Sequence, residues 1–72
     1  MNNNRQMLHS AQVNPVNCLI LESRNSLKYF PSHFQIYFIN SKRRFFVYFK
    51  NRGQLFEAIK ILNEMKIKYR KR

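Results

Sequence analysis

The feature that most restricts the fold of this chain is the alternating stretch HFQIYFINSKRRFFVYFKN, residues 33–51. It contains seven of the chain's eleven aromatic residues (four Tyr and seven Phe in all), and three consecutive cations, Lys42 to Arg44, divide it into two halves. Side chains alternate between the two faces of a β-strand, so each half predicts a strand. We therefore expect a β-hairpin with a turn of two or four residues centred on Ser41–Lys42.

A turn of this kind gives the hairpin one wholly apolar face and one mixed face. The pairs expected on the apolar face, which we assign to the core, are Phe38/Phe45, Ile36/Val47 and Phe34/Phe49. The pairs expected on the mixed face are Ile39/Arg44, Tyr37/Phe46 and Gln35/Tyr48. A turn of odd length would mix the two sets, so the pattern itself favours an even number of turn residues.

The segment that follows the hairpin, residues 52–68, has the apolar spacing of an amphipathic helix. Asn51 is a favourable N-cap residue, and Gln54 stands at the position of its capping-box partner. Because α-helix is disfavoured just before a proline, residues 5–12 predict a short helix that ends before Pro15.

Residues 15–23 complete the expected elements as a short apolar strand. The sequence thus predicts a single small α+β domain over residues 1–72, in the order α-β-β-β-α. A three-stranded antiparallel sheet would pack on the C-terminal helix, with the short helix at the N-terminus. Residues 1–4 and 70–72 are expected to be disordered.

Positive charge is concentrated in the second half of the chain. The formal net charge is +11, and residues 33–72 carry eleven cations against two carboxylates, whereas residues 1–32 carry three against one. Such a field costs self-repulsion in the free protein and is relieved by a polyanion. Nucleic acid is therefore the expected partner, and a role at an anionic membrane surface is a further alternative.

The candidate binding residues fall into two groups. The cations expected to contact phosphate lie at the hairpin turn, the helix start and the tail: Lys42, Arg43, Arg44, Lys50, Arg52, Lys66, Lys68, Arg70, Lys71 and Arg72. On the mixed hairpin face, Tyr37, Phe46 and Tyr48 offer rings for base stacking. The same rings can equally form cross-strand packing, a homodimer contact or an interface with another protein.

The residue inventory offers little for catalysis. Cys18 is the only cysteine, and with two histidines, His9 and His33, it cannot form an internal disulfide or a zinc site. Gly53 is the only glycine, so the chain has no Gly-rich phosphate loop. We expect no catalytic residue, metal or cofactor, and a binding protein rather than an enzyme.

The compartment is predicted from the lone thiol and the absence of a long apolar run. A single cysteine is typical of reducing compartments, and no stretch approaches the length of a membrane-spanning helix. The N-terminal residues lack the apolar centre of a secretory signal. We expect an intracellular, cytoplasmic protein without an integral membrane segment, and an organellar location stays open.

The order α-β-β-β-α with a basic C-terminal helix resembles the double-stranded-RNA-binding fold. AQVNPVNCLILES, HFQIYFINSKRRFFVYF and NRGQLFEAIKILNEM stand at its first strand, middle hairpin and second helix. The resemblance implies that Lys50 and Arg52 take the place of the lysines that contact phosphate in that family. The small HicA-type toxin ribonucleases share the fold, and PSHFQIYF resembles the segment that holds their catalytic histidine, which would give His33 that role.

The sequence therefore predicts a small basic nucleic-acid-binding protein, with RNA favoured over DNA. It would bind phosphate backbone and shape through the hairpin turn, the helix start and the basic tail. One alternative is a protein-interaction or ribonucleoprotein component that uses the aromatic sheet face. The other is a HicA-like toxin ribonuclease.

Overall fold

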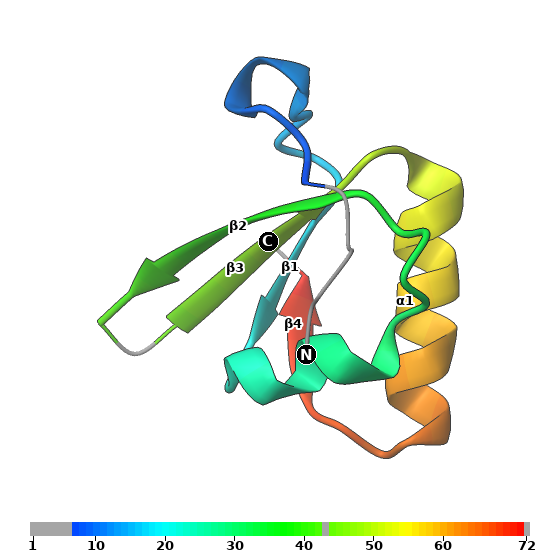
Figure 1. Cartoon of the computed structure of the whole chain (residues 1–72). Helices are drawn as coiled ribbons and strands as arrows, with labels where there is room; N and C mark the ends of the chain where they lie inside the picture. The colour runs from blue at the N-terminus through cyan, green and yellow to red at the C-terminus, as the bar shows by residue number, and fades with distance from the viewer. Residues whose placement is uncertain (1–6, 43, 72) are drawn as a thin grey trace.

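The computed structural model describes residues 7–42 and 44–71, which form a four-stranded antiparallel sheet and one α-helix (Figure 1). The elements in chain order, with η for 3₁₀ helix, are η1 (Ser10–Gln12), β1 (Cys18–Leu21), η2 (Arg24–Tyr29), β2 (Ile36–Ser41), β3 (Arg44–Phe49), α1 (Arg52–Glu64) and β4 (Tyr69–Lys71). The strands lie side by side in the order β2-β3-β1-β4. This is the connectivity of a β-α-β-β-α-β unit in which η2 takes the place of the first helix.

The predicted α+β class is confirmed, but the order α-β-β-β-α is wrong at both ends of the chain. Within the described residues, the expected N-terminal helix is only the 3₁₀ turn η1, in which Gln12 N donates to His9 O at 2.8 Å. A segment this short cannot offset the cost of helix nucleation by itself. The C-terminal difference is a fourth strand, β4, which follows α1.

The hairpin is confirmed with an even connection, but its register differs from the expected one. β2 ends at Ser41 and β3 begins at Arg44, so the connection lies one residue later than predicted. The observed pairs include Ile36/Phe49, Tyr37/Tyr48, Phe38/Val47 and Ile39/Phe46. Because the change in pairing is two residues, every side chain keeps its predicted face.

The apolar face of the hairpin packs against α1, as predicted. The core combines residues of β1, the β2–β3 hairpin, the segment before it and α1: Leu19, Leu21, Phe30, Phe34, Ile36, Phe45, Val47, Phe49, Leu55, Ala58 and Leu62. The predicted N-cap is also confirmed, since Asn51 Oδ1 accepts a hydrogen bond from Gln54 N at 2.8 Å. Burial of these apolar side chains is the main source of stability in a domain of this size.

Helix α1 ends at Glu64, before the predicted end at Lys68. Lys66 N donates to Asn63 O at 3.1 Å and Ile67 N donates to Leu62 O at 2.9 Å, which are the two hydrogen bonds of a Schellman motif. Lys66 adopts the left-handed conformation that this motif requires, with φ of 59°. The backbone therefore leaves the helix direction at this residue.

After this reversal the chain returns along β1 as strand β4. Tyr69, Arg70 and Lys71 pair with Leu21, Ile20 and Leu19. The prediction that residues 70–72 are disordered is therefore wrong for Arg70 and Lys71. Residues 1–4, for which disorder was also expected, and Arg72 lie outside the described residues.

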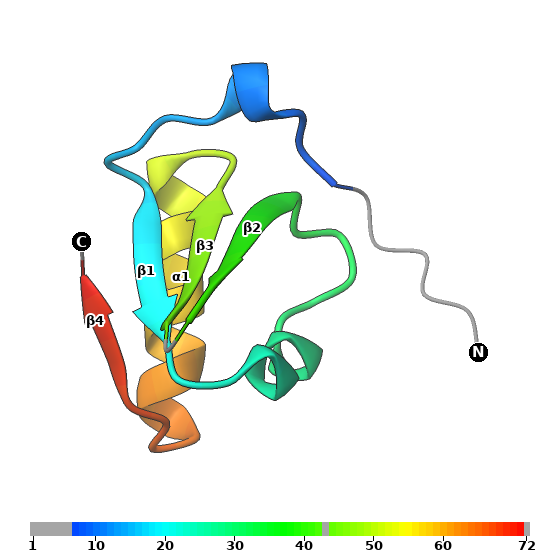
Figure 2. The ribbon, with the colours of Figure 1, turned by 90° about the vertical axis from the view of Figure 1, so that its left-hand side faces the viewer.

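Helix α1 lies on one side of the sheet, and Figure 2 shows the other side of β1 and β3 face on. On that side Cys18 and Tyr48 are nevertheless buried. Residues 7–17 run past the end of the sheet at which β2 begins (Figure 2). There Met7 forms a parallel bridge with Ile36, and Leu8 N donates to Ile36 O at 2.8 Å. We call the side opposite α1 the open face.

Candidate nucleic-acid interface

The residues of the open face are those that alternate with core residues along each strand. Phe46 lies between the core residues Phe45 and Val47, and Ile20 lies between Leu19 and Leu21. The register aligns these side chains in rows across the sheet. One complete row holds one residue of each strand: Ile39, Phe46, Ile20 and Arg70.

Two further rows lie on either side of this one. The row nearer the hairpin turn contains Ser41 and Arg44. The row on the other side contains Tyr37, Tyr48 and Cys18, and the rings of Tyr37 and Tyr48 are 6.1 Å apart. The three rings predicted on the mixed face thus do share one face, and residues from β1 and β4 extend it.

Exposure differs along the open face. Ile39 is 43% exposed, Phe46 and Ile20 are half-buried, and Arg44 and Arg70 are exposed. Tyr48, by contrast, is only 7% exposed. The ring of Phe46 is therefore partly accessible, whereas Tyr48, predicted as a stacking ring, is buried beside Tyr37.

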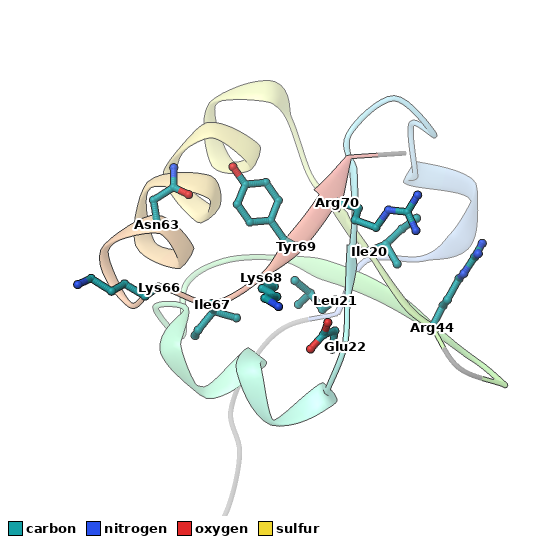
Figure 3. A pocket seen from close by; sticks show the side chains of 10 residues that line it. All are labelled: Ile20, Leu21, Glu22, Arg44, Asn63, Lys66, Ile67, Lys68, Tyr69 and Arg70. Carbon is teal, nitrogen blue, oxygen red and sulfur yellow. The ribbon is translucent and has the colours of Figure 1, made fainter.

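A hollow of about 630 Å³ lies at the hairpin-turn end of β1 and β4 (Figure 3). Its lining residues are Ile20, Leu21, Glu22, Arg44, Asn63, Lys66, Ile67, Lys68, Tyr69 and Arg70. In Figure 3, Arg44 and Arg70 extend to the same side as Ile20, whereas Lys66 extends away from them. The two arginines therefore flank the apolar part of the open face.

The predicted phosphate-contact residues separate into two regions. Arg44 of the turn and Lys68 and Arg70 of the tail line the same hollow, near the exposed Lys42. Lys50 and Arg52 lie beyond the other end of β3, about 20 Å from Arg44 at the rise of an extended strand. The helix start therefore cannot share one phosphate with the turn.

Two groups of the predicted cations do not contribute to this surface in the described structure. Lys71 pairs with the core residue Leu19, so its side chain projects from the α1 side of the sheet. Arg43 and Arg72 lie outside the described residues. The predicted cations that line the hollow are accordingly Arg44, Lys66, Lys68 and Arg70.

The negative charges are placed mainly on the other layer. Glu57 and Glu64 are exposed on α1, and Lys60 stands between them at helical spacing. Glu22, directly after β1, is exposed and lines the hollow. Helix α1 thus carries equal numbers of cations and carboxylates, whereas Arg44 and Arg70 lie on the open face.

Sequence reasoning missed Ile20 and misjudged Arg70. The segment CLIL of β1 is apolar throughout, so it gave no signal for which residues face outward. Arg70 was assigned to a disordered tail because five cations crowd the last seven residues. The alternation of Ile67 and Tyr69 with basic residues in KIKYRKR is the signal that could have predicted a strand there.

His33, to which the resemblance to toxin ribonucleases assigns a catalytic role, is exposed before β2, and its ring lies edge-on to Phe34 at 5.2 Å. Among residues 7–42 and 44–71, no group of three His, Cys, Asp or Glu side chains is placed to hold a metal ion. No helix in this part of the chain is long and apolar enough to cross a membrane. No protein-family model, curated protein or solved structure matches the chain in comparisons with known proteins.

Proposed function

We propose that this protein binds single-stranded nucleic acid, RNA in preference to DNA, on the open face of its sheet. The observation that carries the proposal is the row formed by Phe46, Ile20 and Arg70, with Arg44 next along β3. A partly exposed ring in one row with Arg70, and with Arg44 next on the same strand face, suits a base and its phosphates at once. Base–aromatic stacking contributes about 1–3 kcal/mol per base, and aromatic side chains on four-stranded sheets are a known means of binding RNA.

The charge distribution favours one placement of the bound strand on the protein. Phosphates are attracted to Arg44, Lys68 and Arg70, whereas the two carboxylates of α1 are offset by two cations of the same helix, so the helix layer attracts phosphates less. The strand would therefore lie across the sheet and away from the helix layer. Lys50 and Arg52, about 20 Å from Arg44, would contact phosphates further along the same strand.

The width of the sheet favours a single strand over a duplex. Four strands at the usual spacing span about 14 Å between the outer backbones. The major groove of B-DNA is about 12 Å wide and admits a helix or a two-stranded ribbon. The open face, which is wider than this groove, would therefore meet unstacked bases of a single strand more readily than base edges in a groove.

The decisive experiment compares two phenylalanines on opposite layers. Phe46→Ala removes the proposed stacking ring, and Phe56→Ala removes a ring that is 56% exposed on α1. Fluorescence anisotropy with a labelled single-stranded RNA should show about 5- to 150-fold weaker binding for Phe46→Ala, and no change for Phe56→Ala. Circular dichroism would confirm that both variants are folded.

The proposal fails if the unmodified protein does not bind single-stranded RNA at low salt, or if the two variants bind equally well. A DNA strand of the same sequence tests the preference for RNA. Equal affinity for both strands would limit the proposal to nucleic acid in general.

The exposure of Ile39 favours a second candidate, binding of a protein partner within a ribonucleoprotein. Ile39 is 43% exposed and lies in the same row as Phe46, so the row also offers an apolar contact surface. Ile39→Asp should then abolish capture of the partner from nuclease-treated lysate, while replacement of Arg44 and Arg70 by Ala spares it. The opposite result favours nucleic acid.

A further inference from the structure

The sheet has two edge strands, β4 and β2, and they differ in how open they are to pairing with another chain. β4 is three residues long and carries Arg70 and Lys71, and both short length and charge protect a sheet edge from further pairing. β2 is six residues long, contains no charged residue and exposes Ile39. Figure 1 shows its turn end projecting away from α1. The edge of β2 is therefore the edge at which the sheet can accept a further strand.

The hydrogen bonds at the start of β2 show which of its backbone groups point outward. Ile36 O accepts from Leu8 N at 2.8 Å on the outer side of β2, and Phe49 N, across from Ile36, donates to the segment before β1 instead. Because these directions alternate along an antiparallel strand, the N–H and C=O groups of Phe38 and Asn40 also point outward. Within residues 7–42 and 44–71, no backbone hydrogen bond reaches these four groups.

One antiparallel register with a second copy of β2 uses all four of these groups. In this register Phe38 of each copy pairs with Asn40 of the other, and Ile39 lies opposite Ile39 at a two-fold axis. Phe38 opposite Phe38 would require Ile36 O, which already accepts from Leu8 N. Asn40 opposite Asn40 would leave the groups of Phe38 unpaired. The free groups of the edge are thus complementary to themselves.

The same register continues the central row of the open face into the second copy. The row holds Ile39, Phe46, Ile20 and Arg70 in one copy. With Ile39 opposite Ile39, it crosses the two-fold axis and passes the same four residues in reverse order. An axis perpendicular to the sheet keeps both α1 helices on one side, so the two open faces form one surface. The backbones at the two Phe46 positions would lie about 14 Å apart, which is three strand spacings.

The net charge of +11 on each chain restricts where two copies can meet. Antiparallel pairing of the uncharged β2 places the two basic turns at opposite ends of the contact. Arg44 pairs with Ser41, so the two Arg44 residues would be about 20 Å apart, at three strand spacings across and four residues along. Exposed charges separated by more than the Debye length, about 8 Å at physiological ionic strength, are largely screened. Contact through β4 would instead bring Arg70 and Lys71 of both copies together.

We propose that the protein forms a two-fold symmetric dimer in which β2 pairs antiparallel with β2 of a second copy. The two four-stranded sheets would then be one continuous sheet. This inference goes beyond the proposed function and requires no nucleic acid. The contact involves about five residues of each copy, which is typical of small and weak interfaces. Dimer formation should therefore depend on protein concentration.

Analytical ultracentrifugation of nuclease-treated protein tests for the dimer. The average mass should rise from 8.9 kDa toward twice that value over roughly two decades of concentration. Ile39→Lys places two like charges directly opposite each other and should keep the protein monomeric over the same range. Val16→Lys is the matched control, because Val16 is 67% exposed and precedes β1, an inner strand. It should leave dimer formation unchanged, and circular dichroism should show that both variants are folded.

Cysteine substitution tests the register. In a pair of this kind the Cα atoms are about 4.5 Å apart, within the range of a disulfide, so Ile39→Cys should form a linked dimer under mild oxidation. Asn40→Cys is also exposed, but its Cα would be about 8 Å from that of its copy and should link about tenfold more slowly. The native Cys18 is buried, so each variant presents one exposed thiol.

The proposal is overturned if the unmodified protein stays monomeric at every concentration, which would leave the edge of β2 to a different partner. It is also overturned if Ile39→Lys dimerises as readily as Val16→Lys, or if Asn40→Cys links as fast as Ile39→Cys. Binding of RNA by a monomer would retain the proposed function and reject only the dimer. A dimer that binds no RNA would retain the dimer and reject the proposed function.

Discussion

Arg70 of β4 lies directly opposite Ile20 of β1, on the face of the sheet that also presents Phe46. The register thereby places Arg70 in the same row as Phe46 of the central hairpin, with Ile20 between them. Strand pairing gives Arg70 a defined position, which a disordered basic tail would not have. The following predictions depend on this arrangement and on the fold that produces it.

Removal of the two arginines of the open face should reduce the salt dependence of RNA binding. Arg44→Ala and Arg70→Ala should each lower the slope of log affinity against log salt by about 0.7, the value for one phosphate contact on a single strand. Titrations at several salt concentrations measure the slope. Lys60→Ala on α1 removes the same charge and should leave the slope unchanged, so a matching decrease there would contradict the assigned surface.

Lys66→Gly should stabilise the protein by about 0.5–1 kcal/mol. Lys66 has φ of 59°, a left-handed conformation that side chains with a Cβ adopt at a cost and glycine adopts freely. Urea denaturation of the two proteins gives the free energy of unfolding. Met65, the adjacent residue, has φ of −85°, so Met65→Gly should destabilise instead. If Lys66→Gly destabilises the protein instead, the contacts of the Lys66 side chain stabilise the fold by more than its left-handed backbone destabilises it.

Asn51→Ala should lower the free energy of unfolding by about 1 kcal/mol. The Asn51 side chain accepts a hydrogen bond from Gln54 N at 2.8 Å and so satisfies one of the free N–H groups at the start of α1. Asn63→Ala is a suitable comparison, because Asn63 is exposed near the other end of the helix and alanine is favoured there. Equal effects of the two substitutions would exclude a capping role.

Leu62→Ala should destabilise the protein by about 2–5 kcal/mol, because it leaves a cavity at a fully buried position between α1 and the sheet. In a domain of this size such a loss is a large part of the total stability. Thermal denaturation followed by circular dichroism should show a clearly lower midpoint. Phe56→Ala on the outer side of α1 should shift it little. A small effect of Leu62→Ala would mean that the sheet and helix are not packed as described.

The sequence predicted the elements that local patterns encode. Alternation in residues 33–51 identified the hairpin and separated Phe45, Val47 and Phe49 from Phe46 and Tyr48. Asn51 and the apolar spacing after it identified the start of α1. The error in hairpin register arose because the turn lacks a residue pair that selects one turn type, so its position could shift by one residue without exposing the core.

The end of α1 was harder to predict, because the residue at which the backbone leaves the helix is not of the type that usually ends helices. A left-handed residue after a helix is usually glycine, and here it is Lys66. Without a glycine at this position, the basic segment predicts a helix that continues to Lys68, and the sequence gives no prediction of β4. The exposed fraction of Tyr48 was likewise not predictable, since alternation gives the face of a side chain but not what covers that face.

By itself, the sequence determined the α+β class, the hairpin with its two faces, the start of the helix and the excess of positive charge, because periodicity, caps and charge are properties of neighbouring residues. Only the tertiary structure decided that β4 pairs with β1 and that Arg70 lies in one row with Phe46 and Ile20. These relationships depend on which distant segments share hydrogen bonds and a common core. Such pairing is a free-energy minimum of the whole chain, and no single stretch of residues encodes it.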